Sequence, residues 1–136
     1  MYRYAQRHGF TQMPQLLGVD EDHWTFYVSY AGTTPKKTPR NVERLKTCLK
    51  ELYQRTGLYY HKPDIPQWTL HWGNVCERDG EICLIDFGSR RWRCDPPSAA
   101  REWPETVALL KALNRRAGDL AESHRRVIAL KKGKTS

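Results

Sequence analysis

The chain has 136 residues, of which 39% are hydrophobic and 11% aromatic, so it can bury the core of one domain and is too apolar for a disordered chain. No apolar run approaches the ~20 residues of a membrane-spanning helix, and the first residues form no signal peptide, so we expect a soluble intracellular protein. The net charge of +8 predicts an acidic partner: nucleic acid, nucleotide phosphates or an acidic protein surface.

The first part of the sequence predicts a short helix followed by a β-hairpin. Residues 2–12 place a few aromatic side chains among polar ones, and His8-Gly9 ends that pattern. The runs 15–19 and 24–30 flank an acidic turn, and the second run is rich in aromatic and β-branched residues, which favour strands. We therefore expect the two runs to pair as a hairpin.

A long helix is predicted over 39–56, after a basic linker, 36–40. Thr38 can cap it, Pro39 suits its first position, and Gly57 closes it. Apolar residues recur along it at three- and four-residue steps: Val42, Leu45, Leu49, Leu52 and Tyr53. Its opposite face is basic and carries Arg44, Lys46, Lys50 and Arg55.

The stretch 70–88 predicts a loop, a tight turn and a buried strand. The loop LHWGNV begins at Leu70, the turn signal is Arg78-Asp79-Gly80, and the apolar run 82–85 precedes Asp86. This arrangement brings Asn74 and Asp86 to the same end of the strand. An amide oxygen and a carboxylate placed together can hold a divalent metal and, through it, a polyphosphate. The structural alternative is that Asp86 caps a turn and Asn74 makes loop hydrogen bonds.

The remaining segments give coarser predictions. Two prolines in 58–69 indicate an ordered loop or short extended pieces. Residues 89–97 are basic and without periodicity, which predicts a loop, whereas 102–113 and 120–130 predict helices.

The four cysteines are spaced too unevenly for a zinc site of the CxxC type, and we expect reduced, partly buried thiols. The tryptophans are expected to anchor the core or an interface. They are Trp24, Trp68, Trp72, Trp92 and Trp103.

The segments 70–75 and 84–88 together resemble the catalytic loop and the metal-binding DFG segment of protein-kinase-like enzymes, most closely the small atypical branches such as the aminoglycoside phosphotransferase-like kinases. The resemblance implies an α+β fold, a truncated kinase-like domain with a short N-lobe hairpin and a mainly helical C-lobe. It implies a single domain over 1–136: the N-lobe remnant and hinge in 1–35, the C-lobe in 36–130 and a basic tail in 131–136.

The resemblance also implies a site. Asn74 and Asp86 match the two Mg²⁺ ligands of the family, and backbone groups of the hinge, Ser29, Tyr30 and Ala31, would contact the adenine of ATP. His71 would support the loop rather than act as a base.

The departures from the family pattern concern catalysis. Thr69 stands where the family has its catalytic aspartate, and a threonine cannot act as a carboxylate base. Asp64 is a weak catalytic candidate, since it can substitute only if an insertion rearranges the loop. The sequence has no Gly-x-Gly, and the basic residues of 1–30 are only Arg3 and Arg7, so the glycine-rich loop and the N-lobe lysine are missing.

The sequence therefore predicts a pseudokinase, a structural or protein-interaction component of a larger assembly, in the cytoplasm or associated with a virion. The first alternative is a minimal Mg²⁺- and ATP-dependent serine/threonine phosphotransferase that uses Asn74, Asp86 and Asp64. The second is a basic nucleic-acid-associated protein, supported by the Lys- and Arg-rich residues 111–136.

Overall fold

The computed structural model describes residues 1–23, 25–85, 87 and 91–115, and its fold is α+β, as the sequence predicts. Its elements follow the order α1 (Tyr2–Arg7), β1 (Leu16–Asp20), β2 (Thr25–Val28), α2 (Pro39–Thr56), β3 (Leu58–Tyr60), the 3₁₀ turn η1 (Trp72–Asn74), β4 (Val75–Arg78), β5 (Glu81–Leu84), β6 (Trp92–Cys94) and the 3₁₀ turn η2 (Ser98–Ala100). Residues 104–115 are helical.

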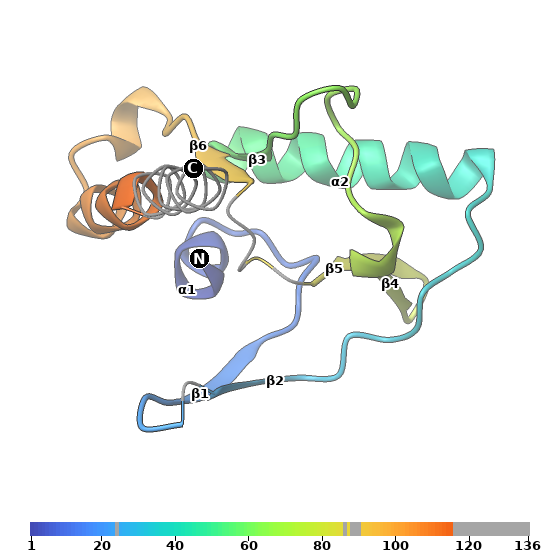
Figure 1. Cartoon of the computed structure of the whole chain (residues 1–136), viewed down its shortest axis with the longest axis horizontal. Helices are drawn as coiled ribbons and strands as arrows, with labels where there is room; N and C mark the ends of the chain where they lie inside the picture. Colours follow the sequence, from blue (N-terminus) through green and yellow to red (C-terminus); the bar gives the residue numbers. More distant parts are fainter. Residues whose placement is uncertain (24, 86, 88–90, 116–136) are drawn as a thin grey trace, which may run out of the picture.

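Helix α2 is the longest of the elements in Figure 1, and both of its ends lie where the sequence predicts them. The Thr38 hydroxyl accepts a hydrogen bond from the Asn41 N–H at 3.2 Å, which satisfies one of the free amides of the first turn. Gly57 ends the helix in a left-handed conformation, with φ of 77°, and donates its N–H to Tyr53 at 2.8 Å. The buried face of α2 carries Leu45, Cys48, Leu49, Leu52 and Thr56.

Within the described residues, the strands form three separate antiparallel pairs, β1 with β2, β3 with β6, and β4 with β5. The first pair confirms the predicted hairpin. In the β4–β5 hairpin, Asp79 and Gly80 both have positive φ, 53° and 80°, which gives the tight turn predicted from the sequence.

Two strands lie where the sequence predicts loops. Residues 75–78 form β4, because Val75 and Cys76 are buried against the core. The prediction of a loop over 89–97 is wrong at β6, whose Trp92 is fully buried and pairs with Tyr60. Because β3 and β6 are distant in sequence, no local pattern signals their pairing.

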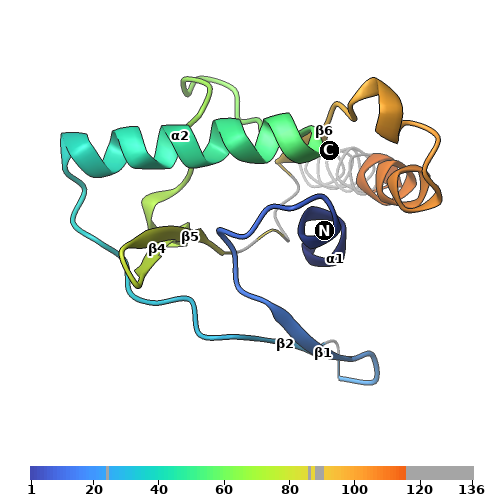
Figure 2. The ribbon, with the colours of Figure 1, turned by 180° about the vertical axis from the view of Figure 1, so that it is seen from behind.

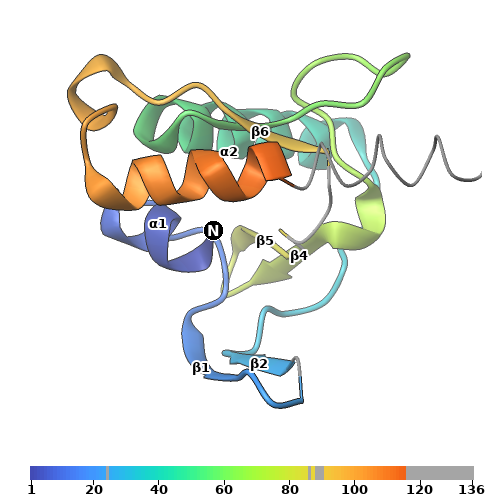
Figure 3. The ribbon, with the colours of Figure 1, turned by 60° about the vertical axis from the view of Figure 1, so that its left-hand side comes forward.

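The core lies between α2, α1, the helical residues 104–115 and the strands. Figure 3 shows α1 beneath the helix of 104–115, with α2 behind it. The Tyr4 hydroxyl of α1 donates to the Thr56 carbonyl at the end of α2, 2.8 Å away, inside the core. The largest fully buried side chains include Phe10, Leu52, Leu58, Ile82 and Trp92. Seen from behind in Figure 2, β4 and β5 lie below the first half of α2, and the β1–β2 hairpin projects from the rest of the molecule.

Candidate functional site

Asn74 lies in η1, half-buried, immediately before strand β4. Its backbone carbonyl oxygen accepts a hydrogen bond from the Ile85 N–H at 3.0 Å. This bond attaches the end of the loop to the residue that directly follows β5. Asp86 is the next residue in the sequence but lies outside the described residues. The metal site formed by Asn74 and Asp86 therefore stays a prediction.

The predicted catalytic positions lie in a segment that is mostly exposed. Asp64 has a φ of 71° and is exposed, as is Gln67. The Thr69 hydroxyl donates to the Pro66 carbonyl at 2.6 Å, which closes a local turn. The position where the kinase-like resemblance would place a catalytic aspartate thus holds a side chain that stabilises its own loop.

His71, for which the resemblance implies a loop-supporting role, forms a hydrogen bond within its own turn. Its Nδ1 accepts a hydrogen bond from the Gly73 N–H at 3.1 Å, at the start of η1. This contact fixes the turn that leads to Asn74.

The predicted hinge residues 29–31 continue from β2. The Ser29 N–H donates to the Gln15 carbonyl at 2.9 Å, and the Ser29 hydroxyl accepts from the Gln15 N–H at 2.8 Å. The Tyr30 carbonyl accepts a hydrogen bond from Arg78, while the Tyr30 side chain is 70% exposed. Two of the backbone groups expected to meet an adenine therefore have partners within the chain.

The segment after the hinge is attached to the β4–β5 hairpin. Thr33 and Glu77 exchange two backbone hydrogen bonds, of 3.2 and 2.7 Å. Gly32 makes this approach possible, because a Cβ there would lie 2.0 Å from the Glu77 oxygen. The Trp72 indole N–H also donates to the Pro35 carbonyl at 2.8 Å. The predicted hinge and the predicted metal-binding hairpin therefore form one connected unit.

Arg44 joins α2 to the same hairpin, although the sequence assigns it to a solvated helix face. Its guanidinium donates to Asn41 Oδ1 at 3.0 Å, to Glu77 Oε2 at 2.5 Å and to the Gly80 carbonyl at 2.6 Å. The sequence offers no signal for this contact, because two of its partners lie more than 30 residues away along the chain.

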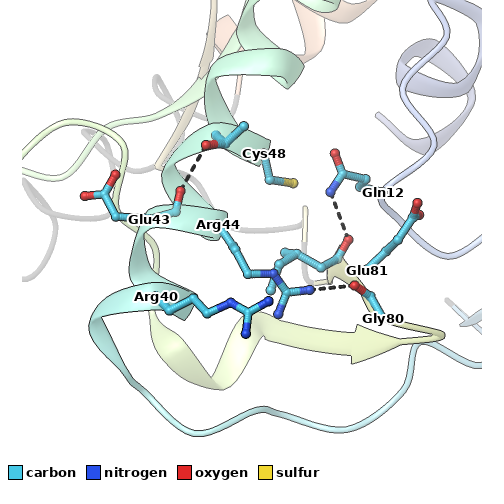
Figure 4. A pocket seen from close by; sticks show the side chains of 9 residues that line it. Gln12, Arg40, Glu43, Arg44, Cys48, Gly80 and Glu81 are labelled. Carbon is cyan, nitrogen blue, oxygen red and sulfur yellow. Dashed lines mark hydrogen bonds between the residues drawn. The ribbon is translucent and has the colours of Figure 1, made fainter.

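An open pocket of about 490 Å³ lies beside Arg44, between α2 and the β4–β5 turn (Figure 4). Arg40 lines it without a hydrogen-bonded partner among the side chains drawn there, and Glu43 and Glu81 line it too. Side chains of both charges therefore line the pocket. Of the predicted site residues that the structure describes, none lines it.

All four cysteines are free, as predicted, and two of them have strongly raised pKa values. Burial raises the pKa of the Cys48 thiol to about 12 and that of Cys94 to about 11. Within the described ranges, no three His, Cys, Asp or Glu side chains are grouped in a way that could hold a metal ion.

Residues 116–136, the C-terminal part of the basic region, lie outside the described residues, as does Trp24. They include all of the predicted last helix, 120–130, and all of the basic tail. Of the other tryptophans, Trp92 is in the core and Trp68 and Trp72 pack against it, whereas Trp103 is 39% exposed and stacks on His8. Among the helices of the part that the structure describes, none has the length and apolarity needed to cross a membrane.

Comparison with known proteins leaves the chain without an assigned family. No protein-family model matches it, and neither a curated protein nor a solved structure does so. The kinase-like resemblance therefore depends on the residues of 70–75 and 84–88 and remains a prediction.

Proposed function

We propose that this chain is a degenerate kinase-like module, a pseudokinase that acts as a structural or interaction component of a larger assembly. The observation that carries the proposal is the hydrogen bond from the Ile85 N–H to the Asn74 carbonyl. This bond joins segment 70–75 to segment 84–88. The residue in contact with Asn74 directly precedes position 86 in the sequence. The bond continues the β4–β5 ladder by one position beyond the Val75 and Leu84 pair.

The order of the elements gives further support. The β1–β2 hairpin, the hinge segment, the long helix α2 and the motif hairpin β4–β5 follow one another in the sequence the resemblance requires. The hinge segment and α2 also contact the motif hairpin, through Thr33 and Arg44. In an ancestral enzyme, a nucleotide bound between the hinge segment and the motif hairpin would need these two parts to be held together.

The surroundings of the catalytic position favour a module without phosphotransfer. A general base is most often an imidazole or a carboxylate, and it must lie within hydrogen-bond reach of the proton that it takes. Thr69 offers only a hydroxyl, which already donates to Pro66. Asp64, the remaining candidate, is on the exposed segment, ten residues before Asn74 in the sequence.

The test measures binding and transfer separately on the full chain. With millimolar MgCl₂ and ATP, we expect no transfer of the γ-phosphate to the chain itself or to generic serine/threonine substrates. Transfer that Asp86→Asn abolishes would contradict the proposal and establish the minimal phosphotransferase. Glu81→Gln, which removes an exposed carboxylate of the same hairpin, is the matched control and should change neither result.

Nucleotide binding is read from the melting temperature in the same samples. A ligand that binds only the folded state raises this temperature by mass action. A rise that needs both Mg²⁺ and ATP and is lost in Asp86→Asn would show that nucleotide binding survives. An unchanged temperature up to millimolar nucleotide would exclude the minimal phosphotransferase.

A further inference from the structure

Two of the four cysteines lie directly opposite each other in the β4–β5 hairpin. The register of this antiparallel pair places Cys76 against Cys83, and both thiols are free. Directly opposite side chains point to the same face of a sheet and are near neighbours. The other two cysteines lie elsewhere, Cys48 on α2 and Cys94 opposite Leu58 in the β3–β6 pair. The strand pairing therefore brings Cys76 and Cys83 together.

The spacing of these two cysteines follows from the hydrogen bonds of the hairpin. Ile85 donates its N–H to the Asn74 carbonyl, which marks Asn74 and Ile85 as a hydrogen-bonded pair. Such pairs alternate along an antiparallel ladder, so Cys76 and Cys83, two positions nearer the turn, form the next one. The Cα atoms of a hydrogen-bonded pair lie about 5.5 Å apart, and disulfides have Cα distances of about 4.4–6.8 Å. The backbone therefore has the separation that a disulfide needs.

The side chains need a small approach before the two sulfurs can bond. Opposite Cβ atoms lie about 4.5–5.5 Å apart in antiparallel pairs, against about 3.5–4.5 Å in disulfides. The bond would also close only the short loop 76–83, which constrains the unfolded chain less than a long loop does. Both features limit the stability of the bond, so an excess of a thiol reductant should break it. A labile disulfide of this kind is typical of regulatory sites rather than of structural cross-links.

We propose that Cys76 and Cys83 are oxidised to a reversible disulfide by a low-molecular-weight disulfide such as oxidised glutathione. One cysteine thiolate attacks a sulfur of the oxidant, breaks its S–S bond and releases one glutathione thiolate. The second cysteine attacks the resulting mixed disulfide and releases the other glutathione. The two cysteines lose two electrons and two protons, and these reduce the oxidant to two thiols. This inference does not depend on the proposed kinase-like function.

Access to the two thiols requires opening of the hairpin, because the exposed fractions of Cys76 and Cys83 are only 6% and 5%. Local opening of part of a structure requires less free energy than global unfolding. The disulfide, once formed, lies two positions from the hydrogen bond between Ile85 and Asn74. It therefore holds together the part of the hairpin that carries the candidate site, and reduction releases it.

The test incubates the reduced full chain in glutathione buffers of increasing oxidised fraction, followed by alkylation of the remaining thiols and mass spectrometry. The oxidised chain should lose two hydrogen atoms and leave two thiols fewer for the alkylating reagent. Trypsin cuts after Arg78, between the two cysteines, so their disulfide should appear as two linked peptides. Millimolar reduced glutathione should restore the thiols. A chain that keeps all its thiols, or that links another pair of cysteines, would overturn the proposal.

The two cysteines are also close in the sequence, so further measurements test whether the bond fits the folded hairpin. Cys48→Ala/Cys94→Ala keeps the pair and should oxidise over the same range of buffers as wild type, within about twofold. The oxidised wild-type chain should melt at or above the temperature of the reduced chain, because the cross-link constrains the unfolded state. Its Ile85 amide should exchange with solvent at least about threefold more slowly. A double variant that resists oxidation, a lower melting temperature or unchanged exchange would each contradict a disulfide between the paired strands.

Discussion

Ile85 donates its backbone N–H to the carbonyl of Asn74, 3.0 Å away, and this bond sets the geometry of the candidate site without using the Asn74 side chain. Asn74→Ala should therefore keep the fold and lower the free energy of unfolding by less than about 1 kcal/mol. Leu84→Ala, on the fully buried end of the same hairpin, should cost about 2–5 kcal/mol because it leaves a cavity. Urea denaturation measures both. A loss for Asn74→Ala as large as that for Leu84→Ala would show that its side chain is structural.

Arg44 is predicted to hold the motif hairpin on α2. Arg44→Ala removes hydrogen bonds to Glu77 and to the Gly80 carbonyl, and should lower the free energy of unfolding by about 1–2 kcal/mol. Arg40→Ala is the matched control, one helical turn earlier, and should stay within about 0.5 kcal/mol of wild type. Equal effects of the two substitutions would mean that the Arg44 contacts contribute nothing beyond a surface charge.

The features that could be predicted from the sequence are those whose signals are local. Thr38, Pro39 and Gly57 mark both ends of α2 within a few residues of the helix itself, and the structure has the helix over Pro39–Thr56. Strand β6 was missed because its pairing with β3 is long-range and the segment around it is basic. The Arg44 contact was missed for the same reason, since amphipathic periodicity assigns a charged residue to solvent. Whether a charged residue on a helix faces solvent or contacts another element depends on the surrounding fold.

Gly57 is predicted to be irreplaceable for two separate reasons. Its φ of +77° is strained for any residue with a Cβ, and that Cβ would lie 2.1 Å from the Asp95 carbonyl oxygen. Gly80 has a similar φ of +80° but nothing within 4 Å, so Gly80→Ala isolates the cost of strain, about 1–2 kcal/mol. Gly57→Ala should cost clearly more, because the β3–β6 pair must also move. Similar unfolding midpoints for the two variants in urea would contradict the close contact.

Cys48 is predicted to make stability depend on pH in the alkaline range. Its pKa is raised from 9.0 to about 12, mainly because the ionised thiolate is costly in the buried site. Above pH 9 the thiol of the unfolded chain loses its proton while the folded chain keeps it, so the unfolded state binds fewer protons and the free energy of unfolding falls. The stabilisation is complete below pH 9 and is lost progressively up to about pH 12.

Urea denaturation at intervals between pH 8 and 11 measures this slope, with Cys48→Ala as the comparison. The variant should be less stable below pH 9, where the wild-type thiol is neutral in both the folded and the unfolded state, because the alanine leaves space beside the packed core. Its stability should nevertheless fall less steeply with pH than that of wild type, since one of the raised thiols is gone. A residual slope is expected from Cys94, whose pKa is raised to about 11 by its burial. Parallel pH profiles for the two proteins would show that the Cys48 thiol reaches solvent before the chain unfolds.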